Sequence, residues 1–449
     1  MLSADSDNRP SSRFAALAFW LALIGAASML YYHQGLFIPR AVEARATLGL
    51  GNGFSFGNDF YQIWLTSREW LGHGRDPYSA QMTREIQIGL YGRTLNSALP
   101  NDPIDQRQFP YPAFTDLLFS PLTKFSFPFV RVAMVFALLL LTVGTVLLWL
   151  RAIDWRLSWP GAAAIVLLTL CSYPALEAFY AVQVGLFVAF LMAASIFALQ
   201  RGRFLLAGIL MAVATIKPQV TILVIGYLLL WCFSDWRQRR GYCIGLFATL
   251  TFLVGASLVF LPSWIQSWVH RVLAYHSYTT PPLVIEVLTR PLGARVAGPA
   301  TIVLVFGTMA FAAIQAWRNR KNAAASLEFE LTFSLLLSIT IIIFVPGQAV
   351  YDHLALLPGI LLLLRYRRQL LSAGTVPAVL TAAGAIVLFW PWAAAFALIV
   401  LRPLLAAPLF FSTAIFDLPI RTAASLPFAV LALLIYARRI VPIAGPEVS

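Results

Sequence analysis

The sequence predicts an all-α polytopic membrane protein, and three observations support that prediction. Of the 449 residues, 60% are hydrophobic and only 11% are charged, whereas about a quarter of an average soluble domain is charged. Apolar runs long enough to cross a bilayer recur along the chain, and short arginine clusters separate them. Segment 33–126 is instead rich in Gly, Pro, Asn and Tyr. We therefore expect one integral membrane domain over 1–449 with a large first external loop.

The charge balance follows from this membrane arrangement. Lys and Arg number 32 against 19 Asp and Glu, for a net charge of +13. A basic surface can bind nucleic acid, but here the basic residues lie between apolar runs, as the positive-inside rule describes. No nucleic-acid partner is expected. The sequence also has no GxGxxG, Walker loop, HExxH or CxxC motif, so neither a cofactor nor a metal site is predicted.

The membrane topology follows from the order of the apolar runs. Arg9 and Arg13 precede the first span, 14–32, which places the N-terminus in the cytoplasm and segment 33–126 outside. A second external loop is expected over 262–298. The later spans are expected at 129–150, 161–176, 184–199, 204–216, 220–233, 242–261, 299–317, 327–345, 353–365, 377–392 and 423–436, with the Pro-broken segment 393–422 between the last two. Roughly twelve spans with both ends inside are predicted, in a multi-pass protein of the cell (inner) membrane.

The most informative polar stretch is 57–78, which follows the first span. Asp59 can cap a helix that starts at Phe60, and Gln62 completes a capping-box pattern. Gly72 and Gly74 are expected to end this helix before a rigid turn at 76–78. Asp59 has a second, compatible reading as a general base that takes a proton from an acceptor hydroxyl.

Other candidate residues lie where apolar runs end. Lys217 follows a short run, where an ammonium group either snorkels to the interface or pairs with an anion. Asp352 and His353 open a later span: they are a cap and an interfacial residue, or else His353 joins Lys217 in offering positive charge to a phosphate. Gln183 starts another span and is a weaker candidate. All of these residues fall on the outer side of the predicted topology.

At this point the sequence resembles glycosyltransferase family 87 of the GT-C superfamily. The resemblance covers about 14–364 and depends on the order of several short motifs. These motifs are Asn58-Asp59-Phe60-Tyr61, Leu71 to Tyr78, Phe109-Pro110-Tyr111-Pro112 with Pro121-Leu122, Ala214 to Pro218, and Tyr351-Asp352-His353.

The resemblance implies a GT-C-like bundle that transfers a sugar, mannose by family default, from a polyprenyl-phosphate donor. The acceptor would be a lipid-linked or glycan hydroxyl on the extracytoplasmic face, and the anomeric centre would be inverted. Carried over by motif, Asp59 would be the catalytic base, and Lys217 and His353 would hold the donor phosphate. The candidate substrate-binding residues would be Asn58, Tyr61, Tyr78, Tyr111, Gln183 and Asp352.

A different class of function also suits roughly twelve spans, namely a lipid or glycan transporter or flippase without transferase activity. Transporters commonly place polar sites near the midplane between repeated halves. Here the polar candidates gather outside, and the large first loop has no counterpart in the second half. The sequence therefore favours the transferase.

Overall fold

The computed structural model describes residues 12–441, except 52, 275–282 and 348. Every regular element in this part of the chain is helical, apart from one isolated bridge between Leu283 and Pro346. The predicted all-α class is therefore confirmed.

Seven helical segments are long and apolar enough to cross a membrane, or eight if one bent pair is counted as a single span. These segments are α1 (Ser12–Tyr31) with η1 (Tyr32–Phe37) and α2 (Ile38–Thr47), α6 (Phe127–Ala152), α12 (Trp236–Phe260), α16 (Ala294–Asn319), α17 (Leu327–Phe344), α20 (Thr375–Leu401), and α23 (Leu418–Arg421) with η5 (Thr422–Ser425) and α24 (Leu426–Ile440). The predicted count of roughly twelve spans is not reproduced by helix length and composition.

The difference in count arises mainly from shorter helices inside the bundle. The bent pair is α7 (Trp159–Leu170) with α8 (Tyr173–Ala181), whose axes differ by 55°. Three more apolar helices are α9 (Gly185–Gln200), α10 (Phe204–Ala214) and α11 (Pro218–Ser234). They have 16, 11 and 17 residues, whereas about 20 residues are needed to cross the hydrocarbon core. These short helices follow one another inside the bundle, and several of the candidate polar residues lie at the breaks between them.

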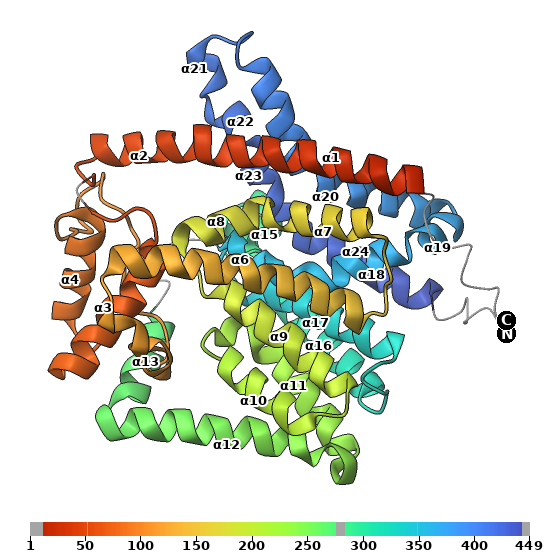
Figure 1. Ribbon diagram of the computed structural model, residues 1–449, viewed down its shortest axis with the longest axis horizontal. Helices are drawn as coiled ribbons and strands as arrows, with labels where there is room; N and C mark the ends of the chain where they lie inside the picture. Colours follow the sequence, from red (N-terminus) through yellow and green to blue (C-terminus); the bar gives the residue numbers. More distant parts are fainter. Residues whose placement is uncertain (1–11, 52, 275–282, 348, 442–449) are drawn as a thin grey trace.

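The long helices α1, α6 and α12 run in roughly the same direction, and loops lie at both ends of the bundle (Figure 1). α1 and α12 lie at opposite edges in this view, and α6, α9, α10 and α11 lie between them. α3, α4 and α13 gather at one end. The remaining elements are α3 (Asn58–His73), α4 (Ala80–Tyr91), α5 (Phe114–Phe119), η2 (Ser120–Lys124), α13 (Trp264–Leu273), α15 (Glu286–Thr289), η3 (Arg290–Leu292), η4 (Val350–Leu356), α18 (Leu357–Arg365), α19 (Arg367–Ser372), α21 (Ala407–Phe410) and α22 (Thr413–Phe416).

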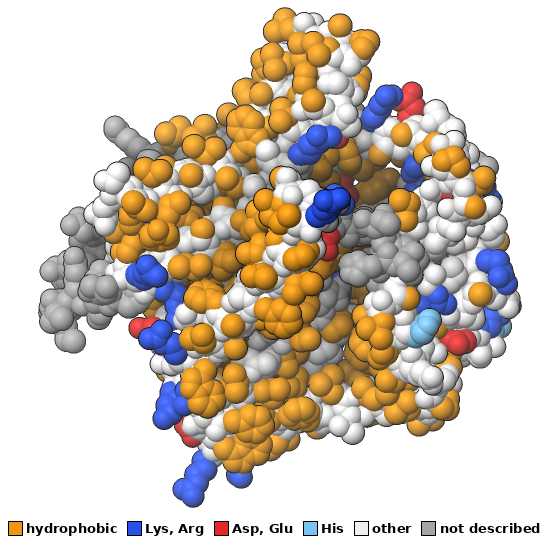
Figure 2. Space-filling model, turned by 180° about the vertical axis from the view of Figure 1, so that it is seen from behind, with side chains coloured by type: hydrophobic (Ala, Val, Ile, Leu, Met, Phe, Trp, Pro, Cys, Tyr) orange, Lys and Arg blue, Asp and Glu red, His pale blue; other side chains and the backbone are white. Residues whose placement is uncertain are grey.

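The outside of the bundle is strongly apolar. Figure 2 shows hydrophobic side chains over most of one face, with several Lys and Arg side chains along one edge. α16 is the most exposed long helix, because only 6% of its apolar window is buried within the protein. This surface matches a lipid environment, in which apolar side chains incur no cost from exposure.

Two glycines allow α10 and α12 to approach closely. A Cβ added at Gly208 of α10 would lie 2.1 Å from the Tyr242 carbonyl oxygen. A Cβ added at Gly245 of α12 would lie 2.2 Å from the Leu205 carbonyl oxygen. Small residues promote helix association in membranes because they let the backbones pack together. This contact fixes the position of α10, whose C-terminal end leads to Lys217.

The first span is longer than predicted. The helix was expected to end at Tyr32, but a π-helical turn over Tyr32–Phe37 carries it into α2 and on to Thr47. The large loop therefore begins after Thr47 rather than at residue 33. Further along this loop lie the short helices α5 and η2.

The helix in stretch 57–78 starts earlier than predicted. Gly57, in the left-handed region with φ 79°, precedes α3, and no side chain caps the helix. Asp59 therefore lies within the first turn, and its predicted role as N-cap is wrong. The C-terminal prediction is confirmed in part: α3 ends at His73 with Gly74 in the left-handed region at φ 68°, and Gly72 is helical. The turn that follows is stabilised by Asp76, whose Oδ1 accepts from the Tyr78 amide at 2.8 Å.

Candidate functional site

Asp59 is held by one partner on each carboxylate oxygen. Arg107 Nη1 donates to Oδ1 at 3.0 Å, and Gln183 Nε2 donates to Oδ2 at 2.6 Å. A carboxylate has about four lone-pair sites, so two of them remain for another donor. The Asp59 side chain keeps 14% of its surface exposed. It is therefore fixed in orientation and still open to a hydroxyl group.

Arg107 is itself held in place by neighbouring residues of the large loop. Its Nε donates to the Tyr91 hydroxyl at 2.9 Å, and its backbone amide donates to Asp105 Oδ1 at 2.9 Å. The negative charges of Asp105 and Asp59 outweigh the cost of burial and raise the pKa of the Arg107 guanidinium, which stays charged. The sequence analysis missed this residue. It is one of many arginines, 48 residues from Asp59, and no motif links the two.

The backbone is strained at or next to each of the two residues that hydrogen-bond Asp59. Arg107 and Val182, the residue before Gln183, each have φ 54°. A left-handed conformation is unfavourable for residues other than glycine, above all for a β-branched one such as valine. In the described part of the chain only one other non-glycine residue, Asp154, has a positive φ. Such strain persists where the surrounding structure enforces it, and it is common at functional sites.

A buried ion pair lies beside this cluster. Lys217 Nζ is 2.7 Å from Asp352 Oδ1, and their side chains are only 4% and 2% exposed. Lys217 occupies the break between α10 and α11, as predicted, and it also lies 4.7 Å from the centre of the Tyr351 ring. An ammonium group has three donors. The contact with Asp352 uses one of them.

Gly185 joins the two parts of the site. A Cβ at this position would lie 2.5 Å from Asp352 Oδ1 and 3.2 Å from Lys217 Nζ. Gly185 begins α9, only two residues after Gln183, which contacts Asp59. The junction of α8 and α9 therefore brings Asp59 and Arg107 next to Lys217 and Asp352. We refer to these four residues with Gln183 as the polar cluster.

His353 follows directly after Asp352 and is 2% exposed. Neither of its ring nitrogens has a hydrogen-bond partner among the described residues. The Asn58 Oδ1 and Gln183 Oε1 atoms are likewise buried with no partner in this part of the chain. Unsatisfied buried polar atoms are rare in folded proteins and call for an explanation. Here they lie in or next to the polar cluster, where a polar ligand would satisfy them.

The three predicted tyrosines take part in packing and in a loop contact. The Tyr78 hydroxyl donates to the Tyr111 carbonyl at 2.8 Å, so these two residues hold loop segments together. Tyr61 is 8% exposed, and its ring packs edge-on against Phe127 at 4.9 Å. Gln183 and Asp352 make direct contacts within the polar cluster, whereas the contacts described for Tyr61 and Tyr78 are with Phe127 and the Tyr111 carbonyl.

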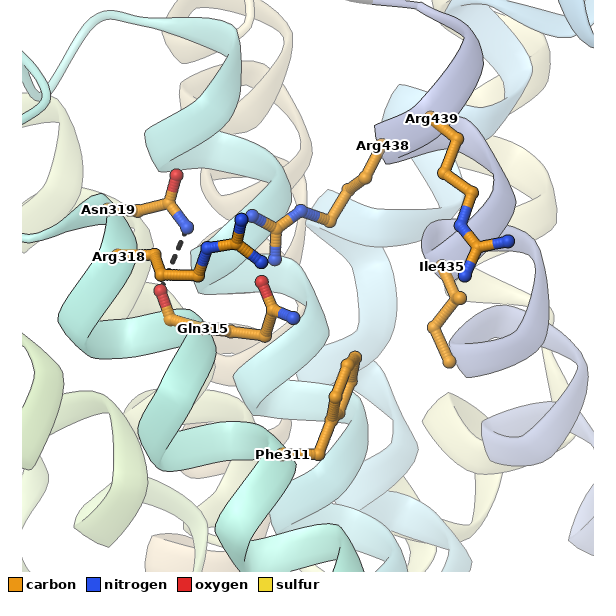
Figure 3. A pocket seen from close by; sticks show the side chains of 7 residues that line it. All are labelled: Phe311, Gln315, Arg318, Asn319, Ile435, Arg438 and Arg439. Atoms are coloured by element: carbon orange, nitrogen blue, oxygen red, sulfur yellow. Dashed lines mark hydrogen bonds between the residues drawn. The ribbon is translucent and has the colours of Figure 1, made fainter.

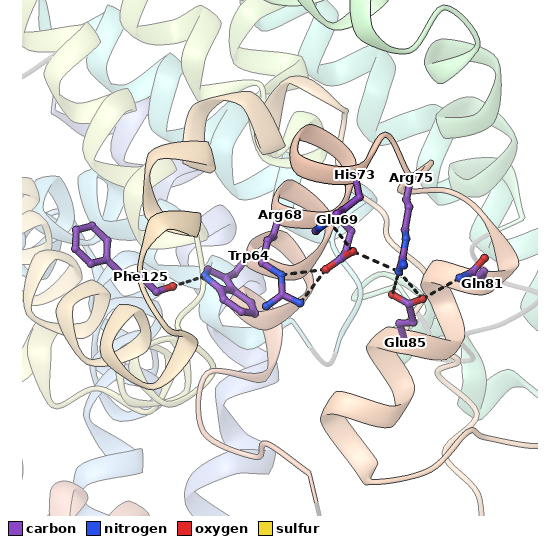
Figure 4. A network of polar contacts seen from close by, with 8 residues as sticks. All are labelled: Trp64, Arg68, Glu69, His73, Arg75, Gln81, Glu85 and Phe125. Carbon is purple, nitrogen blue, oxygen red and sulfur yellow. Dashed lines mark hydrogen bonds and ion pairs between the residues drawn. The ribbon is translucent and has the colours of Figure 1, made fainter.

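A separate charged network stabilises the C-terminal end of α3 (Figure 4). Glu69 Oε1 accepts from Arg68 Nη2 at 2.8 Å, and Glu69 Oε2 lies 3.3 Å from Arg75 Nη1. Arg75 also pairs with Glu85 on α4 at 2.9 Å. This network ties α3 to α4 and anchors the helix that carries Asp59.

Asp116, on α5, is less accessible than Asp59. Asp116 is 0% exposed, and its Oδ1 accepts from Thr66 and Ser67 at 2.9 and 3.1 Å. Burial raises the pKa of Asp116 well above its usual range, and the two hydroxyl groups only partly oppose that shift. Within the described residues, no group of three or more His, Cys, Asp or Glu residues is placed to hold a metal ion.

The fold and the site define a polytopic helical membrane protein with a buried polar cluster where its large loop meets the interrupted helices. The sequence model of glycosyltransferase family 87 matches residues 109–343, a little over half of the chain. The chain belongs to this family and is a glycosyltransferase. The match includes Gln183 and Lys217, whereas Asp59 and His353 lie outside it. No curated protein and no solved structure matches the chain.

Proposed function

We propose that this glycosyltransferase moves a sugar, mannose by family default, from a polyprenyl-phosphate donor to a hydroxyl of a lipid-linked or glycan acceptor. The observation that supports this proposal most directly is that each carboxylate oxygen of Asp59 accepts a hydrogen bond from a protein side chain. A base in this reaction must be oriented, must keep free lone pairs and must be reachable by the acceptor. Asp59 meets all three conditions, with Arg107 and Gln183 as positioning residues.

The proposed reaction is a single displacement. The acceptor hydroxyl gives its proton to Asp59 while its oxygen forms a bond to the anomeric carbon of the sugar. The bond between that carbon and the phosphate oxygen breaks, and its electron pair leaves with the phosphate. Attack opposite the leaving group inverts the anomeric centre. The products are the glycoside and a polyprenyl phosphate, which leaves without needing a proton.

The leaving phosphate needs positive charge and hydrogen-bond donors, and in our proposal Lys217 supplies the charge while the His353 imidazole supplies a donor. Positioned cations and donors stabilise charge that develops in a transition state. Two of the three Lys217 donors are not used by Asp352, and the unpartnered ring nitrogens of His353 lie one residue from that pair. Asp352 would keep Lys217 charged and aimed at the donor. The positive-inside rule places this site on the extracytoplasmic side.

The proposal is tested with purified protein in lipid nanodiscs and radiolabelled polyprenyl-phosphate sugars. Asp59→Asn should slow transfer by roughly 100- to 10,000-fold, the usual contribution of a general base. Its fold should persist, because Gln183 can turn its unpartnered Oε1 toward the new amide. Asp76→Asn is the matched control, since an amide oxygen can also accept from the Tyr78 backbone. Wild-type transfer by Asp59→Asn would show that Asp59 is not the base.

A further inference from the structure

A cavity of about 430 Å³ lies at the end of α16 and α24, away from the polar cluster. Both helices pack against α17. The residues that line the cavity are Phe311, Gln315, Arg318, Asn319, Ile435, Arg438 and Arg439. Figure 3 shows the side chains of Arg318 and Arg438 extending toward each other from α16 and α24, with the Arg439 side chain apart from them. Three cations therefore surround one space that has no acidic lining residue.

These arginines lack the partners that such groups normally have. None of the three is within ion-pair distance of a carboxylate among the described residues. Arg438 Nη1 is fully buried and has no hydrogen-bond partner there. Arg318 repels the charge of Arg438, and Tyr227 and Glu328 act on it in the opposite sense. Like charges that face each other with a buried unpaired donor are unfavourable, and a bound anion would remove both costs.

The positive-inside rule explains why arginines occur at this end of the bundle, but not why they converge on one cavity. The lining of the cavity also changes from charged to apolar along the axes of α16 and α24. Phe311 lies two turns before Arg318 on α16, and Ile435 lies one turn before Arg439 on α24. Further toward the N-terminus of α16 lie Val303 and Phe306, which are 70% and 72% exposed. A ligand that fits has an anionic head and apolar chains, which describes a membrane lipid better than a free ion.

We propose that this cavity binds the phosphate headgroup of an anionic phospholipid from the cytoplasmic leaflet. Arg438 Nη1 and Arg318 would donate to the phosphate oxygens, since planar guanidinium groups suit phosphate geometry. The acyl chains would lie along Phe311 and the exposed face of α16. Because this site is remote from Asp59 and Lys217, the proposal does not depend on the sugar or the acceptor.

The test uses delipidated full-length protein and native mass spectrometry with phosphatidylglycerol as the probe and phosphatidylcholine as the neutral reference. We expect wild type to retain phosphatidylglycerol in preference to phosphatidylcholine. Arg318→Gln and Arg438→Gln should each weaken phosphatidylglycerol binding about fivefold, the contribution typical of one arginine near an anionic lipid surface. The matched control is Arg368→Gln, which removes one exposed charge from α19 and should leave binding unchanged.

Two further measurements distinguish lost binding from misfolding, and a lipid ligand from a soluble anion. Arg318 is exposed, so Arg318→Gln should fold even if Arg438→Gln does not, and Arg438→Lys should recover part of the binding because the charge remains. Inorganic diphosphate, titrated without lipid, tests for a soluble anion. Equal phosphatidylglycerol binding by wild type and both glutamine variants would overturn the proposal. Tight diphosphate binding that phosphatidylglycerol fails to displace would also overturn it.

Discussion

Lys217 Nζ and Asp352 Oδ1 lie 2.7 Å apart in a nearly solvent-free environment. This ion pair joins the break between α10 and α11 to η4, so it contributes to the fold as well as to the proposed phosphate site. A single substitution at either residue leaves a buried charge without its partner. The structural and functional roles of Lys217 therefore have to be separated by changing both residues together.

The first prediction concerns this pair. Lys217→Met or Asp352→Leu alone should cost about 3–5 kcal/mol of stability, because each leaves an uncompensated buried charge. The double variant should recover most of that loss and still fail to bind donor, since no cation remains for the phosphate. Thermal unfolding and donor binding in nanodiscs measure the two effects. Wild-type donor affinity in the stable double variant would remove Lys217 from the phosphate site.

The second prediction concerns Arg107 as a positioning residue. Arg107→Gln removes the donor to Asp59 Oδ1 and should lower kcat by about tenfold or more, because small misplacements of a reacting group are costly. The KM for donor should change little, since the side chain of Arg107 contacts Asp59, Tyr91 and Asp105 rather than the proposed phosphate site. Steady-state kinetics measure kcat and the KM for donor separately. A raised KM with unchanged kcat would mean that Arg107 binds substrate instead.

The third prediction concerns the close contact of α10 and α12. Gly245→Ala places a methyl group against the Leu205 carbonyl and should cost about 1–3 kcal/mol, as overpacking usually does. Gly255→Ala on the same helix is the control, since no atom lies within 4 Å of its added Cβ. That change should be neutral or stabilising by up to about 1 kcal/mol. Equal melting temperatures for the two variants would argue against tight packing at Gly245.

The fourth prediction concerns Asp116 and pH. Burial raises the pKa of this carboxyl well above its usual range, so the folded state binds its proton more tightly than the unfolded state does. Stability is therefore highest below the unfolded pKa of about 4 and falls as pH rises toward the folded pKa. Asp116→Asn, which is neutral at every pH, should lose this dependence and melt higher than wild type at pH 8. A wild-type melting temperature that rises between pH 5 and pH 8 relative to the variant would contradict this assignment.

The helical class, the turn at Asp76 and the break at Lys217 could be predicted because each depends on local sequence. Apolar composition, a Pro after Lys217 and an Asx turn act over a few residues. The start of α3 was misplaced because Gly57 adopts a left-handed conformation that the capping pattern does not reveal. The partners of Asp59 could not be predicted either. Arg107 and Gln183 are 48 and 124 residues away, and only the packing of the α8–α9 junction against the loop brings them together.

The shortness of α10 determines how close Lys217 lies to the basic end of that helix. An 11-residue helix is about 16 Å long, roughly half of a hydrocarbon core of about 30 Å. Because α10 begins directly after Arg203, Lys217 follows within little more than that length. In our proposal, a donor phosphate bound by Lys217 would therefore lie among the helices, where protein side chains replace the water that hydrates a phosphate at the membrane surface, while the polyprenyl chain remains in an apolar environment.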